Sequence, residues 1–152
     1  MINPGHPAAR RQAAVPPALR RLASLRYEIR RFLRFSEKAA RGAGLTPMQH
    51  QMLLGVAGFT GRGWATISEL AEFLQARHNS VVELVKRGVR VGLVAKDPQP
   101  GDRRFVRVRL TPSGERLLSR LSNVHLGEIR RLRTHLQRVG FTRPRHAKQG
   151  RR

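Results

Sequence analysis

Arginine dominates the side chains in this sequence that could take part in recognition chemistry. Of the 31 Lys and Arg residues 27 are Arg, and only 9 Asp and Glu residues oppose them, so the net charge is +22. A guanidinium donates paired hydrogen bonds to phosphate groups and to the edge of guanine. This excess of cations favours binding to a polyanion, either nucleic acid or an anionic membrane surface. A solvated basic surface that reflects only the base composition of the genome is the plainer alternative.

Groups suited to catalysis are scarce by comparison. The chain has no Cys, which excludes disulfides, thiolate metal sites and thiol-based redox sensing by this chain. It contains neither a phosphate-binding glycine loop nor a plausible pair of catalytic carboxylates. His125, Glu128 and His135 could be drawn as a metal site along one helix, but the set lacks a convincing fourth ligand. We therefore expect no enzyme, no cofactor and no metal site.

The elements that would position the basic side chains lie between residues 66 and 110. Thr66 and Glu69 have the spacing of a capping box, which starts a short helix. A second helical pattern runs from about residue 79 to residue 91, and Gly92 is a typical helix stop. Two short helices in this order predict a helix-turn-helix.

Beyond this point the pattern changes from helical to alternating. Residues 93–97 and 104–110 have the alternation of two strands, joined by the turn-forming residues 98–102. Two short helices followed by a basic hairpin describe a winged helix-turn-helix. The predicted fold class is mainly α with a small β-hairpin wing (α+β), in which long dimerisation helices flank the winged helix-turn-helix.

One long helix is predicted on each side of the winged region, over residues 18–41 and from Thr111 onward. Apolar residues recur in both at spacings of three or four, as in the seam of a helix–helix interface. Because a small winged domain cannot easily bury both stripes within one monomer, we expect a homodimer. The residues predicted at or near its interface are Leu22, Ile29, Leu121, Ile129 and Leu132.

Three residues leave alternatives open. His125 falls on the apolar stripe of the last helix, where it is either a pH-sensitive group or, more simply, a hydrogen-bonded histidine. Trp64 precedes the helix-turn-helix and either lines a ligand pocket or packs at the base of the wing, which is the favoured interpretation. Gly127 is expected to kink the last helix or divide it in two.

The domain organisation follows from these elements. Residues 1–17 are predicted to form a disordered arm, and residues 18–139 the winged domain with its dimerisation helices, whose DNA-binding core is 46–111. Residues 140–152 are predicted to form a basic tail. No apolar run approaches the length of a transmembrane helix, and the first 17 residues lack the apolar core of a secretory signal. We expect a cytoplasmic protein that does not enter a membrane.

The chain resembles the MarR family of bacterial transcription factors over roughly residues 25–133. The matching segments are ISELA at 67–71, SVVELVKR at 80–87 and the wing residues DRR at 102–104, followed by VRLTPSG at 108–114. The resemblance implies a dimeric regulator, here expected to be a repressor, that binds pseudo-palindromic double-stranded DNA in the bacterial nucleoid. Members of the family are often released from DNA by small phenolic ligands or oxidation, so a small-molecule effector is expected without being identified.

The resemblance also implies the DNA-binding residues. Residues 78–91 correspond to the recognition helix in the major groove, where Asn79 would read adenine, Glu83 would accept from cytosine and Lys86 would reach guanine or phosphate. The full major-groove set is His78, Asn79, Ser80, Val82, Glu83 and Lys86. In the wing, Arg104 would enter the minor groove with Asp102 orienting it. The expected phosphate contacts are Thr66, Arg77, Arg87 and Arg103.

One departure from the family pattern affects the recognition helix. Gly88 stands where similar proteins carry a large apolar residue, and a glycine in mid-helix costs about 1 kcal/mol relative to alanine. The sequence therefore predicts a softer or kinked recognition helix.

Two other kinds of function fit parts of the sequence. The charge of +22 suits a non-specific nucleoid-associated or RNA-binding protein, whose affinity would depend on salt but not on sequence. The winged domain could also be a protein-interaction scaffold, although the polar outer face of residues 79–87 argues against that.

Overall fold

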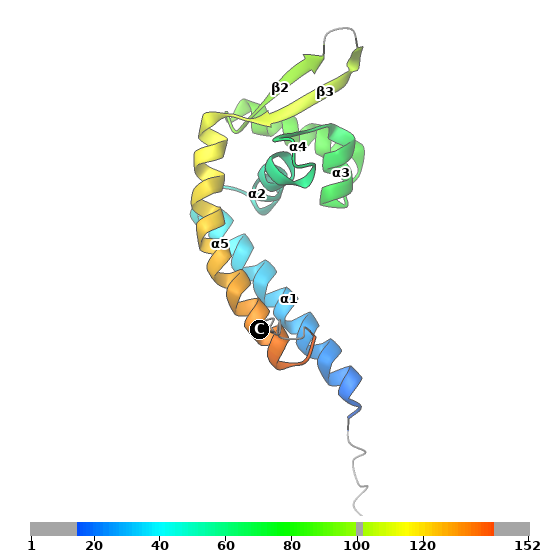
Figure 1. Cartoon of the computed structure of the whole chain (residues 1–152). Helices are drawn as coiled ribbons and strands as arrows, with labels where there is room; N and C mark the ends of the chain where they lie inside the picture. Colours follow the sequence, from blue (N-terminus) through cyan, green and yellow to red (C-terminus); the bar gives the residue numbers. More distant parts are fainter. Residues whose placement is uncertain (1–14, 100–101, 142–152) are drawn as a thin grey trace, which may run out of the picture.

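Figure 1 shows a small lobe of short helices and strands joined to a stalk of two long helices. This computed structural model describes residues 15–99 and 102–141, and the side chains of residues 98–105 lie outside the description. The stalk consists of α1 (Pro17–Gly42) and α5 (Pro112–Arg138). The lobe consists of α2 (Pro47–Leu54), the π-helical η1 (Gly55–Phe59), β1 (Trp64–Ala65), α3 (Ile67–Leu74), α4 (His78–Arg90), β2 (Val94–Gln99) and β3 (Asp102–Leu110).

The predicted domain ends fall largely outside the described residues. Of the arm assigned to residues 1–17, only residues 15–17 are described, and Pro17 is already the first residue of α1. The basic tail is described only as far as Phe141. Within the described ranges, no helix combines the length and the hydrophobicity needed to cross a membrane.

Capping boxes start two of the short helices, and the sequence predicts the one at Thr66. The Thr66 side chain accepts a hydrogen bond from the Glu69 backbone N–H at 3.3 Å, and the Glu69 carboxylate accepts one from the Thr66 backbone N–H at 2.7 Å. Thr46 and Gln49 form the same pair of bonds at the start of α2. These bonds satisfy N–H groups that the first turn of a helix leaves free.

The wing is longer than the sequence suggests. Strands β1, β3 and β2 form one antiparallel sheet in that order, and Val94 pairs with Leu110 at the base of the hairpin. The predicted turn over residues 98–102 is too wide, because β2 continues to Gln99 and β3 begins at Asp102, with a register shift at Pro98. Backbone hydrogen bonding between the strands therefore extends the hairpin farther than side-chain alternation alone indicates.

The core of the lobe lies between α2, α3, α4 and the sheet. Its fully buried side chains include Met52, Leu53, Leu70, Val85, Val94 and Val108. The segment that follows α2 is in part helical: η1 continues α2 and brings Gly55 against Phe73. A Cβ at Gly55 would stand 2.8 Å from Phe73 Cδ1, so the absence of a side chain permits this packing.

Gly88 has a packing role that the sequence does not reveal. A Cβ at this position would stand 2.7 Å from Met52 Cε and 3.0 Å from Val94 Cγ2. Helix α4 nevertheless runs as one α-helix from His78 to Arg90. The predicted kink is therefore wrong: the volume that a larger residue would fill is occupied by Met52, and the i→i−4 hydrogen bonds do not depend on the side chain.

Helices α1 and α5 pack side by side in the stalk. Leu118 and Leu121 of α5 are buried, and Leu25 and Phe32 of α1 are half-buried. Leu121 is only 4% exposed and belongs to the protomer's own core, and its predicted place at or near a dimer interface remains a prediction. The other side of both helices stays open: Leu22 is 54%, Ile29 42% and Ile129 45% exposed. Leu132 is half-buried. Helix α5 also continues without a break through Gly127, where a kink is predicted.

His125 is a buried, hydrogen-bonded residue at the junction of stalk and lobe. Its Nδ1 donates to the Leu121 carbonyl at 2.7 Å, so in the neutral ring Nε2 accepts from the Ser36 hydroxyl at 2.9 Å. The His50 ring lies 4.8 Å from the His125 ring, and the Phe32 and Phe35 rings approach it edge-on. Two imidazoles thus share one apolar enclosure, in which a charge on either would be poorly solvated.

Acidification is expected to destabilise the protein through His50. Burial, and then the proximity of His125, lower the pKa of His50 below its ordinary value of 6.5. A depressed pKa in the folded state means that below pH 6.5 the unfolded chain binds the proton more readily, so stability falls as the pH falls. Thermal unfolding between neutral pH and pH about 5 should show this loss, and His50→Gln should reduce it.

The exposed His78 provides the control for this measurement. His78→Gln removes an imidazole of the same type from the surface and should leave the pH dependence of the wild type intact. If the stability of His50→Gln falls with pH as steeply as that of the wild type, groups other than His50 cause the acid sensitivity.

Candidate nucleic-acid interface

Helix α4 separates sharply into a buried and an exposed face. Val81, Leu84, Val85 and Gly88 face the core of the lobe. The predicted base-contacting residues lie on the other side: His78, Asn79, Ser80, Glu83 and Lys86 are exposed, and Val82 is half-buried. Exposed hydrogen-bonding groups on one side of a helix are what direct reading of base edges requires.

Glu83 and Lys86 are paired with each other on this exposed face. The Lys86 Nζ lies 2.7 Å from Glu83 Oε1, and the hydrogen bond and charge of this ammonium lower the pKa of the Glu83 carboxyl. The sequence assigns the two residues to separate bases. The ion pair makes their roles dependent on each other, because a base or phosphate that takes one partner must break or rearrange the pair.

The predicted phosphate contacts are not equivalent. Arg77 is the N-cap residue of α4, and both Arg77 and Arg87 are exposed. Thr66 is half-buried, and its hydroxyl donates to Glu69 Oε2 at 3.0 Å while its backbone N–H donates to the same oxygen. Both donors of Thr66 are thus used by the helix cap, and its predicted phosphate contact remains a prediction.

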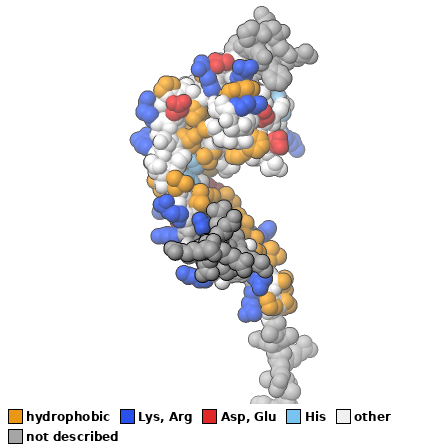
Figure 2. Space-filling view, viewed as in Figure 1, with side chains coloured by type: hydrophobic (Ala, Val, Ile, Leu, Met, Phe, Trp, Pro, Cys, Tyr) orange, Lys and Arg blue, Asp and Glu red, His pale blue; other side chains and the backbone are white. Residues whose placement is uncertain are grey.

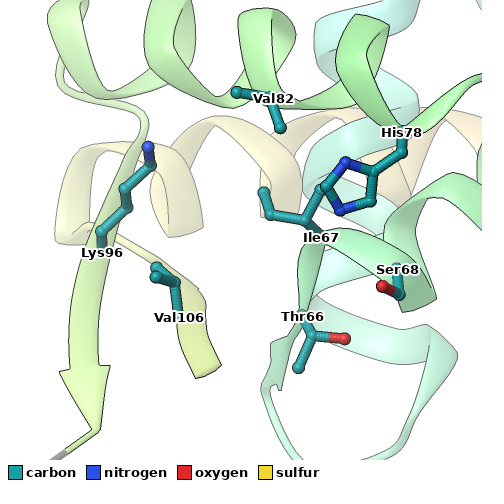
Figure 3. Close-up of a pocket in the computed structure, with 7 residues that line it drawn as sticks. All are labelled: Thr66, Ile67, Ser68, His78, Val82, Lys96 and Val106. Atoms are coloured by element: carbon teal, nitrogen blue, oxygen red, sulfur yellow. The ribbon is translucent and has the colours of Figure 1, made fainter. Parts of the chain in front are cut away.

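A hollow of about 360 Å³ separates α4 from the wing. Figure 3 shows His78 and Val82 on the α4 side, Lys96 and Val106 on the strands, and Ile67, the first residue of α3, beside His78. Lys96 is absent from the residues predicted from the sequence. Its position on β2 gives little local signal, since only the pairing of β2 with β3 turns its ammonium group towards α4.

The base of the wing is held by stacked arginines. The Arg62 guanidinium lies 3.9 Å and that of Arg107 4.6 Å from the centroid of the Trp64 ring. Trp64 therefore packs at the base of the wing, as the sequence favours, and β1 pairs it with Arg109. Nε of Arg109 also lies 2.6 Å from the Asp97 carboxylate across the hairpin. These contacts stiffen the strands that carry the wing tip.

The wing tip itself lies outside the described side chains. This applies to Asp102 and Arg104, predicted to act in the minor groove, and to Arg103, predicted to contact phosphate. Their backbone belongs to β3, which begins at Asp102. Their roles remain predictions.

The side chains of His125, Glu128 and His135, which the sequence suggests as a possible metal site, contact other residues instead. Both ring nitrogens of His125 are hydrogen-bonded, to Leu121 and Ser36. The Glu128 carboxylate lies 3.5 Å from Arg31 and 3.5 Å from Arg131, and no metal-binding group of three ligands occurs among the described residues. Side chains held in this way do not converge on one ion.

Comparison with known proteins supports the interpretation of the lobe as a winged helix-turn-helix. Residues 43–104 match the family model described as the MarR family. A Thauera aromatica protein, assigned as a transcriptional regulatory protein for the hcr operon, is 30% identical over 96 residues, or 63% of this chain. The match spans 56% of the length of that relative, so the chain corresponds to little more than half of it.

Solved structures share the fold at lower identity. AbsC, a MarR family transcriptional regulator from Streptomyces coelicolor, has a TM-score of 0.65 at 20% identity over 84% of each chain. A mutant of MepR from S. aureus, solved with a bound oligodeoxyribonucleotide, has a TM-score of 0.58 at 20% identity, covering 77% of this chain and 80% of that one. With the family model matched from α2 into the wing, the winged region of this chain is similar to that of the MarR family.

Proposed function

We propose that this protein is a transcriptional regulator, not an enzyme, that binds double-stranded DNA of defined sequence as a homodimer and acts as a repressor. In the proposed complex α4 enters the major groove and the wing enters the adjacent minor groove. The observation that carries the proposal is the exposed face of α4, where Asn79, Glu83 and Lys86 present hydrogen-bonding groups beside a basic wing. The oligodeoxyribonucleotide bound to MepR, a protein of the same fold, supports DNA as the partner.

The proposed homodimer rests on the open side of the stalk. Leu22, Ile29 and Ile129 expose large apolar side chains there, and packing them against a second copy would remove that surface from water. A two-fold dimer would present two copies of α4 to one side of a duplex. The half-site centres should then lie about 10 bp apart, one turn of B-DNA.

An effector site would fit the hollow between α4 and the wing. Its volume of about 360 Å³ is in the range of small-molecule sites, and Ile67, Val82 and Val106 provide an apolar lining beside the cationic Lys96. A ligand there would occupy the space between the two elements proposed to hold DNA. Release from DNA by a small molecule is therefore part of the proposal, with the ligand still to be identified.

Asn79→Ala and Lys86→Ala test the major-groove assignment. If each side chain makes a good base contact, each variant should lose roughly 1–3 kcal/mol of discrimination between the operator and random DNA. Fluorescence anisotropy on both DNAs measures this difference directly. Because Lys86 is paired with Glu83, Glu83→Gln should separate the loss of the lysine from the loss of the ion pair.

Arg90→Gln is the matched control for these substitutions. Arg90 is exposed in the last turn of α4, away from the N-terminal half of the helix that is proposed to approach the bases. The Arg90→Gln variant should lose affinity for operator DNA and for random DNA to similar degrees. Equal losses on both DNAs for Asn79→Ala and Lys86→Ala would assign these residues to phosphate and remove the proposed base contacts.

A non-specific nucleic-acid-binding protein is the second candidate, favoured by the net charge of +22. Selection of binding sites from a random DNA library distinguishes the two. A specific dimer should enrich a palindrome with fixed half-site spacing. No enrichment, with strong salt dependence on every DNA and RNA tested, would establish the non-specific protein instead.

A further inference from the structure

A second basic site lies on the stalk, apart from α4 and the wing. A hollow of about 400 Å³ opens beside α5, next to α1. It is lined by Arg31, Arg130, Arg131, Thr134, His135 and Arg138, together with Gly127. We propose that this hollow binds a small, multiply charged anion of the organic-phosphate class.

The charges around the hollow do not cancel. Four guanidinium groups face it, while the neighbouring carboxylates are Glu28, 3.7 Å from Arg31, and Glu128, 3.5 Å from both Arg31 and Arg131. Arg130 and Arg138 have no ion pair with any residue in the described parts of the chain. Two positive charges therefore remain without a counter-charge, and an anion would supply it.

The two carboxylates hold part of the site in place. The Glu28 side chain is 5% exposed and that of Glu128 11%, so both lie beneath the surface and anchor Arg31 from within the helix pair. Glu28 Oε1 also lies 3.6 Å from His135 Nε2. A guanidinium has five N–H donors, so an anchored arginine keeps donors for a ligand. Anchoring lowers the conformational entropy that the side chain must lose when a ligand binds.

The lining indicates the chemical class of the ligand. None of the residues that line the hollow has a large apolar side chain, and the Thr134 hydroxyl donates to the Arg130 carbonyl at 3.0 Å. A phenolic ring would find no large apolar side chain to pack against here. Guanidinium pairs instead match the oxygens of phosphate groups, and the volume suits a small molecule rather than a duplex.

The hollow would stay accessible in the proposed homodimer. At about 100° per residue, Arg31 on α1 and Arg131 on α5 lie on the flank of their helices away from Ile29 and Ile129, respectively. Figure 2 shows Lys and Arg side chains along one edge of the stalk and mainly hydrophobic side chains along the other. A second copy packed on the apolar flank would leave the basic flank open to solvent.

Titration calorimetry of the full-length protein with inorganic tripolyphosphate tests the site. At about 0.15 M salt, where diffuse attraction is screened, one tripolyphosphate should bind per protomer. The double variant Arg130→Gln/Arg138→Gln should weaken this binding by at least about tenfold, because it removes the two unpaired guanidiniums. Arg116→Gln/Arg120→Gln removes the same charge from exposed positions of α5 outside the hollow, and should change the affinity by less than about twofold.

A third variant separates this site from the proposed DNA-binding face. Lys86→Ala/Arg87→Gln removes two cations from α4 and should leave tripolyphosphate binding unchanged. Loss of binding in this variant would place the anion on α4 and overturn the stalk site. The stalk site would also be overturned if the two α5 double variants weakened tripolyphosphate binding equally. Many weak binding sites in place of one would overturn it too, because both results would show that only the net charge of the protein matters. Failure of sequence-specific DNA binding would leave the expected result unaltered, since no DNA is used.

Discussion

Gly114→Ala is expected to lower the free energy of unfolding by roughly 3 kcal/mol, the upper range for overpacking a core. A Cβ at this position would stand 2.1 Å from the Leu93 carbonyl oxygen, a backbone atom that cannot rotate away. That oxygen accepts hydrogen bonds from the Thr111 backbone N–H at 3.1 Å and from its hydroxyl at 3.2 Å. Gly114 therefore lets the first turn of α5 press directly on the end of the α4–β2 connection. Urea unfolding followed by circular dichroism measures the loss.

Gly127→Ala makes the same chemical change on the same helix and is the matched control. No heavy atom lies within 4 Å of a Cβ at Gly127, which is in the middle of α5. The substitution should stabilise the protein by about 0.5–1 kcal/mol, because alanine loses less backbone entropy in a helix than glycine. The two variants should thus differ in sign. If Gly114→Ala has the same free energy of unfolding as the wild type, α5 can move away from Leu93 without loss of stability.

Ile29→Glu/Ile129→Glu is expected to convert a dimer into folded monomers and to weaken operator binding by about 10²-fold or more, through loss of bivalent contact. Ile29 is 42% and Ile129 45% exposed, and neither belongs to the buried core of the protomer. Two carboxylates on each apolar flank would face like charges and lose solvation if the flanks met. Sedimentation velocity and anisotropy with operator DNA give the two readouts, and circular dichroism confirms that the fold persists.

Tyr27→Glu is the control for the dimer surface. Tyr27 is 62% exposed, and two positions away on α1 it points about 200° from Ile29. This variant should remain a dimer and keep its affinity for the operator within a few-fold. A wild-type protein that sediments as a monomer at micromolar concentration would exclude the proposed homodimer. A variant that stays dimeric with two glutamates in place would assign the interface to another surface.

Local chemistry in the sequence was sufficient to predict most of the elements. The capping box at Thr66 depends on residues three positions apart, and the helix stop at Gly92 depends on one residue, whose φ is 71°. The helical pattern from about residue 79 to residue 91 likewise predicts α4, which runs from His78 to Arg90. Such signals are reliable because the interacting groups are neighbours along the chain.

Contacts between distant segments decided the rest. The stripe on α5 contains both Leu121 and Ile129, but only the packing of α1 against α5 determines that the first is 4% and the second 45% exposed. Gly88 suggests a weak helix until Met52, thirty-six positions earlier, is seen to occupy the space beside it. Lys96 lines the hollow beside α4 only because β2 pairs with β3 opposite this helix. Periodicity tells which residues share a face, whereas the partner of that face depends on how the whole chain packs.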